Sequence, residues 1–292
     1  KYILLCYLSV GSYSSSWFCL LLPVLVLVTH FVSYHGCSTE SCSHHSRHSR
    51  TGRCHCPSPG TRLQGGMSSL RALYHSRLLT TYSQVINYAN NTSRAEDVLK
   101  ELNNIPSTVS SQTSPRFHAI KADIGNRDAI TTLIQETITT MGRLDVVISN
   151  AGYTRLTNFM NFDEQHFDED WDKCFLYNVK AHMWLAYAAR EHLDKTEGAF
   201  ITTASIAGVK PSGSSLPYAV TKAASIHLTK CLANICAPRI RFNSVSPGLM
   251  LTEWGYKFSE QKREAHKNNT KLKRLPEVDV SGLEFYIKRI QC

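Results

Sequence analysis

The second half of the chain contains four residues that together could transfer a proton: Asn178, Ser205, Tyr218 and Lys222. Tyr218 and Lys222 are four positions apart, so on a helix the phenol and the ammonium lie on one face. A phenol has a pKa of about 10 and is a poor acid near neutral pH, and an adjacent cation favours its charged form. We therefore interpret Tyr218 and Lys222 as an acid–base pair.

The elements around these residues must bring them together. Residues 198–205 read Gly-Ala-Phe-Ile-Thr-Thr-Ala-Ser, a β-prone apolar run that predicts a strand with Ser205 at its carboxyl end. From Leu216 the apolar residues follow a helical period, and Pro238 ends that helix. A strand thus delivers the serine, and the next helix delivers the tyrosine and the lysine.

The same alternation of elements extends along the chain and predicts an α/β fold. Short apolar segments lie at 85–88, 117–124, 145–149, 199–203 and 240–245. Longer stretches of helical period separate them, which predicts a mostly parallel sheet with helices on both faces. Ligands of such sheets bind beyond the carboxyl ends of the strands, where all the candidate residues fall.

In order and spacing these residues resemble the short-chain dehydrogenase/reductase family, and the resemblance runs from about residue 85 to residue 276. Asn178, Ser205, Tyr218 and Lys222 have the spacing of that family's catalytic residues. The other matching motifs are Asp123 after the third strand, Asn150-Ala151-Gly152 after the fourth strand, and Pro247, Gly248 and Thr252. The resemblance implies a Rossmann-type, doubly wound parallel sheet in a single domain.

The family's activity is hydride transfer between a nicotinamide and a carbonyl or alcohol carbon. By resemblance, Tyr218 gives a proton to the carbonyl oxygen, and Ser205 donates a hydrogen bond to the same oxygen. Lys222 lowers the pKa of Tyr218 and binds the nicotinamide ribose, while Asn178 holds a water that leads to bulk solvent. The implied substrate is a small carbonyl or alcohol, and the implied assembly is a homo-oligomer, a tetramer or a dimer.

The second strand indicates which dinucleotide binds. Residues 84–94 read Gln-Val-Ile-Asn-Tyr-Ala-Asn-Asn-Thr-Ser-Arg and contain no carboxylate. An Asp or Glu there would bind the ribose hydroxyls of NAD and repel a 2′-phosphate, so its absence favours NADP (NADPH). Arg94 either adds charge to the phosphate site or lies on the solvent face of its helix. The cofactor-binding residues that the resemblance implies are Asn87, Asn90, Thr92, Asp123, Ile124, Asn150, Ala151, Gly152, Tyr218, Lys222, Pro247, Gly248 and Thr252.

Both ends of the chain depart from the family pattern. The positions of the glycine-rich phosphate motif hold Gln64, Ser68 and Leu70, and no apolar strand precedes them. Residues 281–292 are too short for a final helix and strand. We therefore expect a sheet without a proper first strand and last strand, from an altered reading frame or a retained intron. The alternative to an active enzyme is a non-catalytic or mis-spliced remnant that cannot bind dinucleotide.

Each motif also has a purely structural interpretation. Taken singly, Asn178 could face solvent, Ser205 could satisfy a strand end, and Asp123 could cap a helix. Gly152 and Gly248 could simply form turns. Six motifs in family order favour the functional interpretation.

Composition divides the chain into three parts. Residues 63–280 form the expected domain, 1–62 a hydrophobic and then Ser/His/Cys/Arg-rich extension, and 281–292 an aberrant tail. The net charge of +9 belongs to the flanks and gives no support for nucleic-acid binding by the domain. Residues 17–32 are nearly all apolar, so the extension is either a membrane anchor or disordered. We expect a cytoplasmic protein, with membrane anchoring as the alternative.

Ten cysteines and thirteen histidines raise the question of a metal site. Cys37, Cys42, Cys54 and Cys56 lie among histidines, but their spacings match no regular zinc finger. The proposed chemistry needs no metal, so we predict none.

Overall fold

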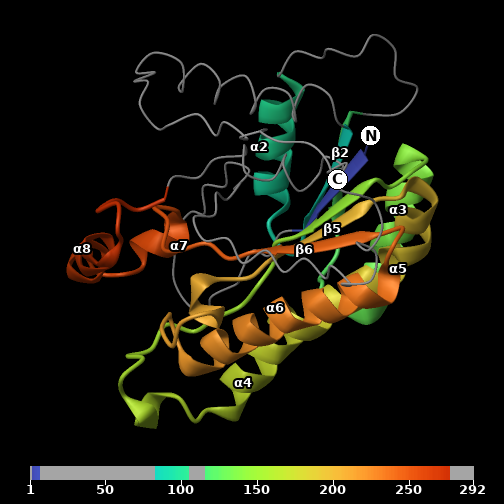
Figure 1. The fold of residues 1–292 in the computed structure, drawn as a ribbon. Coiled ribbons are helices and arrows are strands. Elements are labelled where there is room, and N and C mark those ends of the chain that lie inside the picture. The colour runs from blue at the N-terminus through green and yellow to red at the C-terminus, as the bar shows by residue number, and fades with distance from the viewer. Residues whose placement is uncertain (1, 7–82, 105–115, 277–292) are drawn as a thin grey trace, which may run out of the picture.

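The computed structural model describes residues 2–6, 83–104 and 116–276. These segments form one six-stranded sheet with helices along it (Figure 1). The strands are β1 (Tyr2–Cys6), β2 (Ser83–Tyr88), β3 (Phe117–Lys121), β4 (Val146–Ser149), β5 (Ala199–Thr203) and β6 (Arg241–Val245). Their spatial order is β3-β2-β1-β4-β5-β6, and every neighbouring pair is parallel. The predicted doubly wound parallel sheet is confirmed.

The central place in the sheet is held by β1, and this corrects one expectation. Sequence spacing predicts a sheet that lacks its first strand and puts residues 1–62 outside the domain. In the structure Leu4 pairs with Val85 on one side and with Val147 on the other. Tyr-Ile-Leu-Leu-Cys is uncharged and β-prone, so it suits a position with strands on both sides.

The α-helices are α2 (Thr92–Asn103), α3 (Arg127–Met141), α4 (Asp168–Phe175), α5 (Ala181–Thr196), α6 (Leu216–Cys236), α7 (Glu253–Tyr256) and α8 (Glu260–Asn269). Helices α2 to α6 lie between successive strands and bury part of their surface, whereas α7 and α8 follow β6 and α8 buries no residue. Figure 1 shows α5 and α6 side by side along one side of the sheet and α2 on the other side. The core between sheet and helices is apolar, with Ile130, Leu133 and Phe200 fully buried.

Helix caps explain where the site-bearing helices begin. Asn91 accepts a hydrogen bond from the Arg94 amide at the start of α2, and Ser215 accepts one from the Tyr218 amide at the start of α6. Pro217 lies in the first turn of α6, where its missing N–H costs nothing. The cap therefore fixes the point at which α6 starts, one residue after Ser215.

Several expectations concern residues outside the described segments. These are the replaced glycine positions at 64, 68 and 70, the apolar run 17–32, the Cys/His-rich tract and the tail 281–292 with the last strand. Within the described segments, no helix is long and apolar enough to cross a bilayer. The same segments contain no group of His, Cys, Asp and Glu side chains suited to a metal ion.

Candidate active site

The catalytic candidates meet where β5 ends and α6 begins. Ser205 follows β5 and caps the short helix η3 (Ile206–Gly208), with its Oγ accepting from the Ala207 amide at 3.1 Å. Tyr218 lies in the first turn of α6, where the Ser205 side chain is near enough to lower the pKa of its phenol. The strand-then-helix arrangement predicted from the sequence thus joins the serine and the tyrosine.

Lys222 lies one turn further along α6, with only 3% of its surface exposed. Its Nζ donates to the Thr203 carbonyl at 2.7 Å and lies 5.6 Å from the centroid of the Tyr218 ring. Burial disfavours the charged form and lowers the pKa of Lys222 from 10.5 to about 8. A lysine with such a pKa can exchange protons near neutral pH.

The electrostatics of Tyr218 differ from the sequence expectation. Burial raises the pKa of the phenol above 10.0, while the nearby Ser205 side chain lowers it by less. Lys222 is not among the causes of the shift. The tyrosine is therefore held as a neutral O–H, because in this partly buried position desolvation outweighs the stabilisation of a phenolate.

Asn178 is fully buried in a π-helical segment, Leu176–Lys180. Its Oδ1 accepts from the Tyr153 amide at 2.7 Å, and its Nδ2 donates to the Tyr153 carbonyl at 2.9 Å and to the Thr221 hydroxyl at 3.0 Å. Its backbone carbonyl accepts from Ser225 Oγ. Each of the two oxygens accepts one hydrogen bond from the protein, so the expected water-holding role stays a prediction. The side chain ties the loop after β4 to α6.

Gly152 shows how closely that loop approaches the catalytic residues. A Cβ at this position would lie 3.0 Å from Asn178 Oδ1 and 3.4 Å from Lys222 Nζ. The glycine is therefore needed for space between the loop and the two side chains. Of the neighbouring candidates, Ala151 is buried in the core and Asn150 is partly buried directly after β4.

The residues predicted to bind the adenosine half of the cofactor lie at the end of β2 and the start of α2. Asn90 and Thr92 are exposed at the start of α2. Asn87 is fully buried, its Nδ2 donates to the Ala122 carbonyl at 2.8 Å, and its Oδ1 has no partner. Arg94 was left open by the sequence: its Nε and Nη2 are buried without a hydrogen-bond partner, so a solvent-facing guanidinium is wrong.

Asp123 and Ile124 follow β3 and have different surroundings. Asp123 is exposed, and its carboxylate accepts from the Gly125 amide at 2.8 Å and from the Tyr177 hydroxyl at 3.4 Å. The Ile124 side chain is 1% exposed and belongs to the core, so only its backbone can face a ligand. Tyr177 packs its ring against Gly125 and was missed by the sequence, since no spacing rule singles it out.

Pro247, Gly248 and Thr252 follow β6 and lie on the loop toward α7. The Pro247 carbonyl accepts from the Ile206 amide at 2.8 Å, which joins this loop to the turn after Ser205. A Cβ at Gly248 would meet only Pro276, at 3.9 Å. The loop therefore borders the serine, as the sequence pattern predicts.

A buried histidine also lies in this region and was not predicted. His182 is 1% exposed, and its Nδ1 lies 2.5 Å from Ser149 Oγ at the end of β4. Burial and then the charge of Lys222 lower the pKa of His182 to about 3, so the ring is neutral. Because a histidine in a helical pattern has no distinguishing neighbours, only the fold reveals it.

Comparisons with known proteins agree with this geometry. Residues 65–263 match the profile of the family described as short chain dehydrogenase. The chain is 30% identical over 209 residues to the Staphylococcus aureus 3-oxoacyl-[acyl-carrier-protein] reductase FabG, covering 70% of this chain and 80% of the relative. It is 35% identical over 136 residues to a granaticin polyketide synthase putative ketoacyl reductase 2 from Streptomyces violaceoruber, covering 46% of this chain but only about half, 54%, of that relative.

A solved short chain dehydrogenase from Burkholderia cenocepacia in complex with NADP has the same fold. Its TM-score is 0.62 at 25% identity, over 73% of this chain and 83% of that one. Similar structures carry NADH as well as NADP, so the fold alone does not select the cofactor. The family profile and the 30% identical relative show that the chain belongs to the short-chain dehydrogenase/reductase family.

Proposed function

We propose that the chain is an NADP(H)-dependent oxidoreductase that reduces a carbonyl, or oxidises an alcohol, with Asn178, Ser205, Tyr218 and Lys222 as its catalytic group. The observation that carries the proposal is the placement of Tyr218 beside Ser205 and one helical turn from a buried Lys222 with a pKa of about 8. The similarity to ketoacyl reductases makes 3-oxoacyl thioesters the first substrates to assay.

Tyr218 acts as the proton donor to the carbonyl oxygen. Because burial keeps the phenol neutral, it carries the proton that reduction requires. Ser205 lies beside the same hydroxyl and donates to the substrate oxygen as negative charge develops there. Lys222 is protonated below about pH 8 and, because it exchanges protons near neutral pH, returns a proton to Tyr218 after the transfer.

Asn178 serves this group by holding its supports in place. Its amide joins Tyr153 on the loop after β4 to Thr221 on α6, next to Lys222 in sequence. The loop and the helix therefore keep a fixed separation, which Gly152 fills closely. We expect Asn150 to Gly152, which the family resemblance assigns to the cofactor, to keep a constant distance from the lysine as a result.

The residues present fit a dinucleotide with a 2′-phosphate. Arg94 offers two buried guanidinium nitrogens without partners beside the exposed start of α2, where the backbone N–H groups and the helix dipole favour an anion. Asp123 offers a carboxylate that suits the amino group of adenine, and Lys222 would bind the nicotinamide ribose. When bound, the cofactor supplies the hydride.

The remaining expectations stay part of the proposal. The substrate is a small carbonyl or alcohol, and the protein works as a homo-oligomer in the cytoplasm without a metal or nucleic acid. The alternative is a non-catalytic remnant of such an enzyme that cannot bind dinucleotide. It is favoured by Gln64, Ser68 and Leu70, which stand at the positions of the family's glycine-rich motif. The two differ in one measurable property, which is the affinity for NADPH.

Titration of the full chain with NADPH and with NADH, read by cofactor fluorescence, tests the proposal. We expect saturable binding that favours NADPH, and turnover of a 3-oxoacyl thioester that Tyr218→Phe abolishes. Arg94→Ala should weaken NADPH binding about tenfold to hundredfold, the value of a charge-assisted phosphate contact, and leave NADH binding unchanged. The control is Arg190→Ala on α5, an exposed arginine on the other side of the sheet. Absence of saturable binding would refute the enzyme and favour the remnant.

A further inference from the structure

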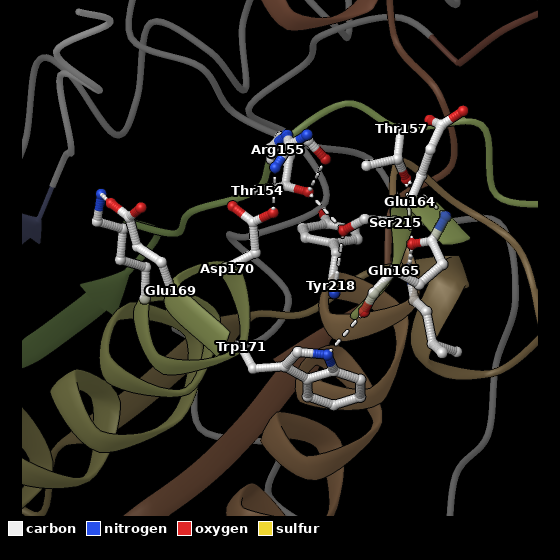
Figure 2. Close-up of polar contacts among 12 residues, drawn as sticks. Thr154, Arg155, Thr157, Glu164, Gln165, Glu169, Asp170, Trp171, Ser215 and Tyr218 are labelled. Carbon is white, nitrogen blue, oxygen red and sulfur yellow. Dashed lines mark hydrogen bonds and ion pairs between the residues drawn. The ribbon is translucent and has the colours of Figure 1, made fainter. Parts of the chain in front are cut away.

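The loop after β4 folds over the start of α6, the helix that carries Tyr218 (Figure 2). Thr154 Oγ1 lies 2.8 Å from Ser214 Oγ and 3.2 Å from Ser215 Oγ. Thr157 adds a backbone bond, its amide donating to the Ser214 carbonyl at 2.9 Å. Polar groups of the loop thus meet the two residues that precede α6.

Gln165 completes this contact from the far end of the same loop. Its Nε2 donates to the carbonyls of Asn158 at 2.9 Å and Asn161 at 3.1 Å, so it gathers the loop around itself. Its Oε1 accepts from the Leu216 amide at 2.9 Å, across 51 residues of sequence. Figure 2 shows Gln165 next to Thr157, with Ser215 and Tyr218 close by.

The hydrogen bond between Gln165 and Leu216 matters because the Leu216 amide is the first N–H group of α6. The first N–H groups of a helix have no partner within the helix and need one from elsewhere. In α6 the Tyr218 amide is held by the Ser215 hydroxyl, and the Leu216 amide is held by Gln165. Gln165 is 4% exposed, so water cannot readily replace it. Two side chains therefore define the first turn of α6, and one of them comes from the loop.

The carboxamide is suited to this place because it both donates and accepts. Two carbonyls and one amide converge on it, and only Gln or Asn satisfies both kinds of group. The backbone of Gln165 is itself fixed, since its carbonyl accepts from Trp171 Nε1 at 2.9 Å, at the start of α4. The side chain thus connects the α4 region to the first turn of α6.

We propose that Gln165 is a positioning residue that fixes the first turn of α6 and, through it, the hydroxyl of Tyr218. The catalytic consequence rests on the proposed function, whereas the structural link does not. Because Tyr218 is two residues beyond Leu216, a loosened first turn displaces the phenol relative to Ser205 and the substrate oxygen. A misplacement of about 1 Å at a reacting group can cost about a hundredfold in rate.

The test uses the full chain and two variants that separate the two halves of the carboxamide. Gln165→Met removes every hydrogen bond of the side chain. Gln165→Glu keeps an acceptor for the Leu216 amide but loses the donors to the Asn158 and Asn161 carbonyls. The matched control is Gln135→Met, at an exposed glutamine of α3.

Hydrogen exchange of residues 214–218 measures the link without any substrate. We expect faster exchange there in Gln165→Met, a smaller change in Gln165→Glu and none in the control. In steady-state kinetics, kcat should fall about tenfold or more in Gln165→Met while the Kd for NADPH stays within twofold. The solvent deuterium isotope effect on kcat should increase, because proton donation by Tyr218 becomes slower.

The outcomes separate this inference from the proposed function. Unchanged exchange at 214–218 in Gln165→Met overturns the link. Faster exchange with kcat per folded molecule unchanged overturns the positioning of Tyr218 and leaves Gln165 a structural residue only. If native protein shows protected amides that Gln165→Met releases, but no NADPH binding or turnover, the link is supported and the proposed function fails. If Gln165→Met is too unstable for kinetics, the hydrogen exchange of residues 214–218 in Gln165→Glu is compared with that in native protein, and this comparison decides the test.

Discussion

Replacement of Lys222 by methionine should make the protein more stable near neutral pH while abolishing turnover. The lysine is 3% exposed, and burial lowers its pKa from 10.5 to about 8. At about 1.4 kcal/mol for each pKa unit, the folded state pays about 3 kcal/mol to keep the ammonium charged at pH 7. Methionine has a similar length and carries no charge, so it removes this cost.

The sign of the pH dependence follows from the direction of the shift. Below about pH 8 the lysine is charged in both states, and the destabilisation is fully present. As the pH rises from 8 toward 10.5, the folded state releases the proton first, so the unfolded state binds more protons and stability rises. Between pH 7 and pH 9 the native protein should gain about 1 kcal/mol from this group.

A hydrogen bond of Lys222 offsets part of this gain in stability. Lys222 Nζ donates to the Thr203 carbonyl at 2.7 Å, and losing that bond leaves a carbonyl unpaired at a cost of about 1–3 kcal/mol. The net gain of Lys222→Met at pH 7 is therefore about 0–2 kcal/mol. The pH dependence is the cleaner test, because the lost hydrogen bond changes little over this range.

Urea unfolding of native protein, Lys222→Met and the exposed control Lys195→Met at pH 7, 8 and 9 measures the effect. Native protein and the Lys195 control should gain stability in parallel relative to Lys222→Met. If all three curves run parallel from pH 7 to pH 9, the buried charge does not carry the stated cost and the reasoning is refuted.

Two further predictions concern the same site. The rate of carbonyl reduction should fall above about pH 8, because Lys222 loses the proton that it would return to Tyr218. A pH profile of kcat that stays flat to pH 9.5 would contradict this. Gly152→Ala should destabilise the protein by about 1–3 kcal/mol, since its Cβ would lie 3.0 Å from Asn178 Oδ1 and that amide is held by Tyr153 and Thr221. Gly248→Ala is the matched stability control, because its Cβ meets only one atom at 3.9 Å, and equal unfolding midpoints for both variants would sink the packing argument.

The sequence predicted those parts of the site that local pattern determines. A strand followed by a helix with Tyr and Lys one turn apart leaves little freedom, so Ser205, Tyr218 and Lys222 were brought together as expected. The absence of a carboxylate after β2 was likewise readable, because it depends on residue type alone. Both features depend on residues that are close together in the sequence, so they can be predicted without a structure.

The parts that failed depend on long-range contacts. Tyr2–Cys6 pairs with strands beginning at residues 83 and 146, and a five-residue apolar run gives no sign of so distant a partner. The balance of desolvation and charge at Tyr218 depends on burial, which residue spacing does not express. Gln165 acts through a bond to Leu216 across 51 positions, and glutamine in a polar loop has no distinguishing pattern.

The two halves of the site are supported by different elements, and this decides how a defect would appear in an assay. Tyr218 and Lys222 are fixed by β5, α6 and the loop after β4, whereas Asn87 belongs to β2 and Arg94 to α2. Affinity for a dinucleotide comes largely from its phosphates, while kcat depends on the proton donor beside the nicotinamide. Weaker binding of the cofactor phosphates would raise the KM for NADPH and leave kcat at saturation unchanged. A loosened first turn of α6 would lower kcat and leave the KM for NADPH unchanged. Kinetics measured over a range of NADPH concentrations therefore distinguish an enzyme with poor cofactor affinity from a chain that has lost catalytic activity. A rate measured at one NADPH concentration cannot distinguish them.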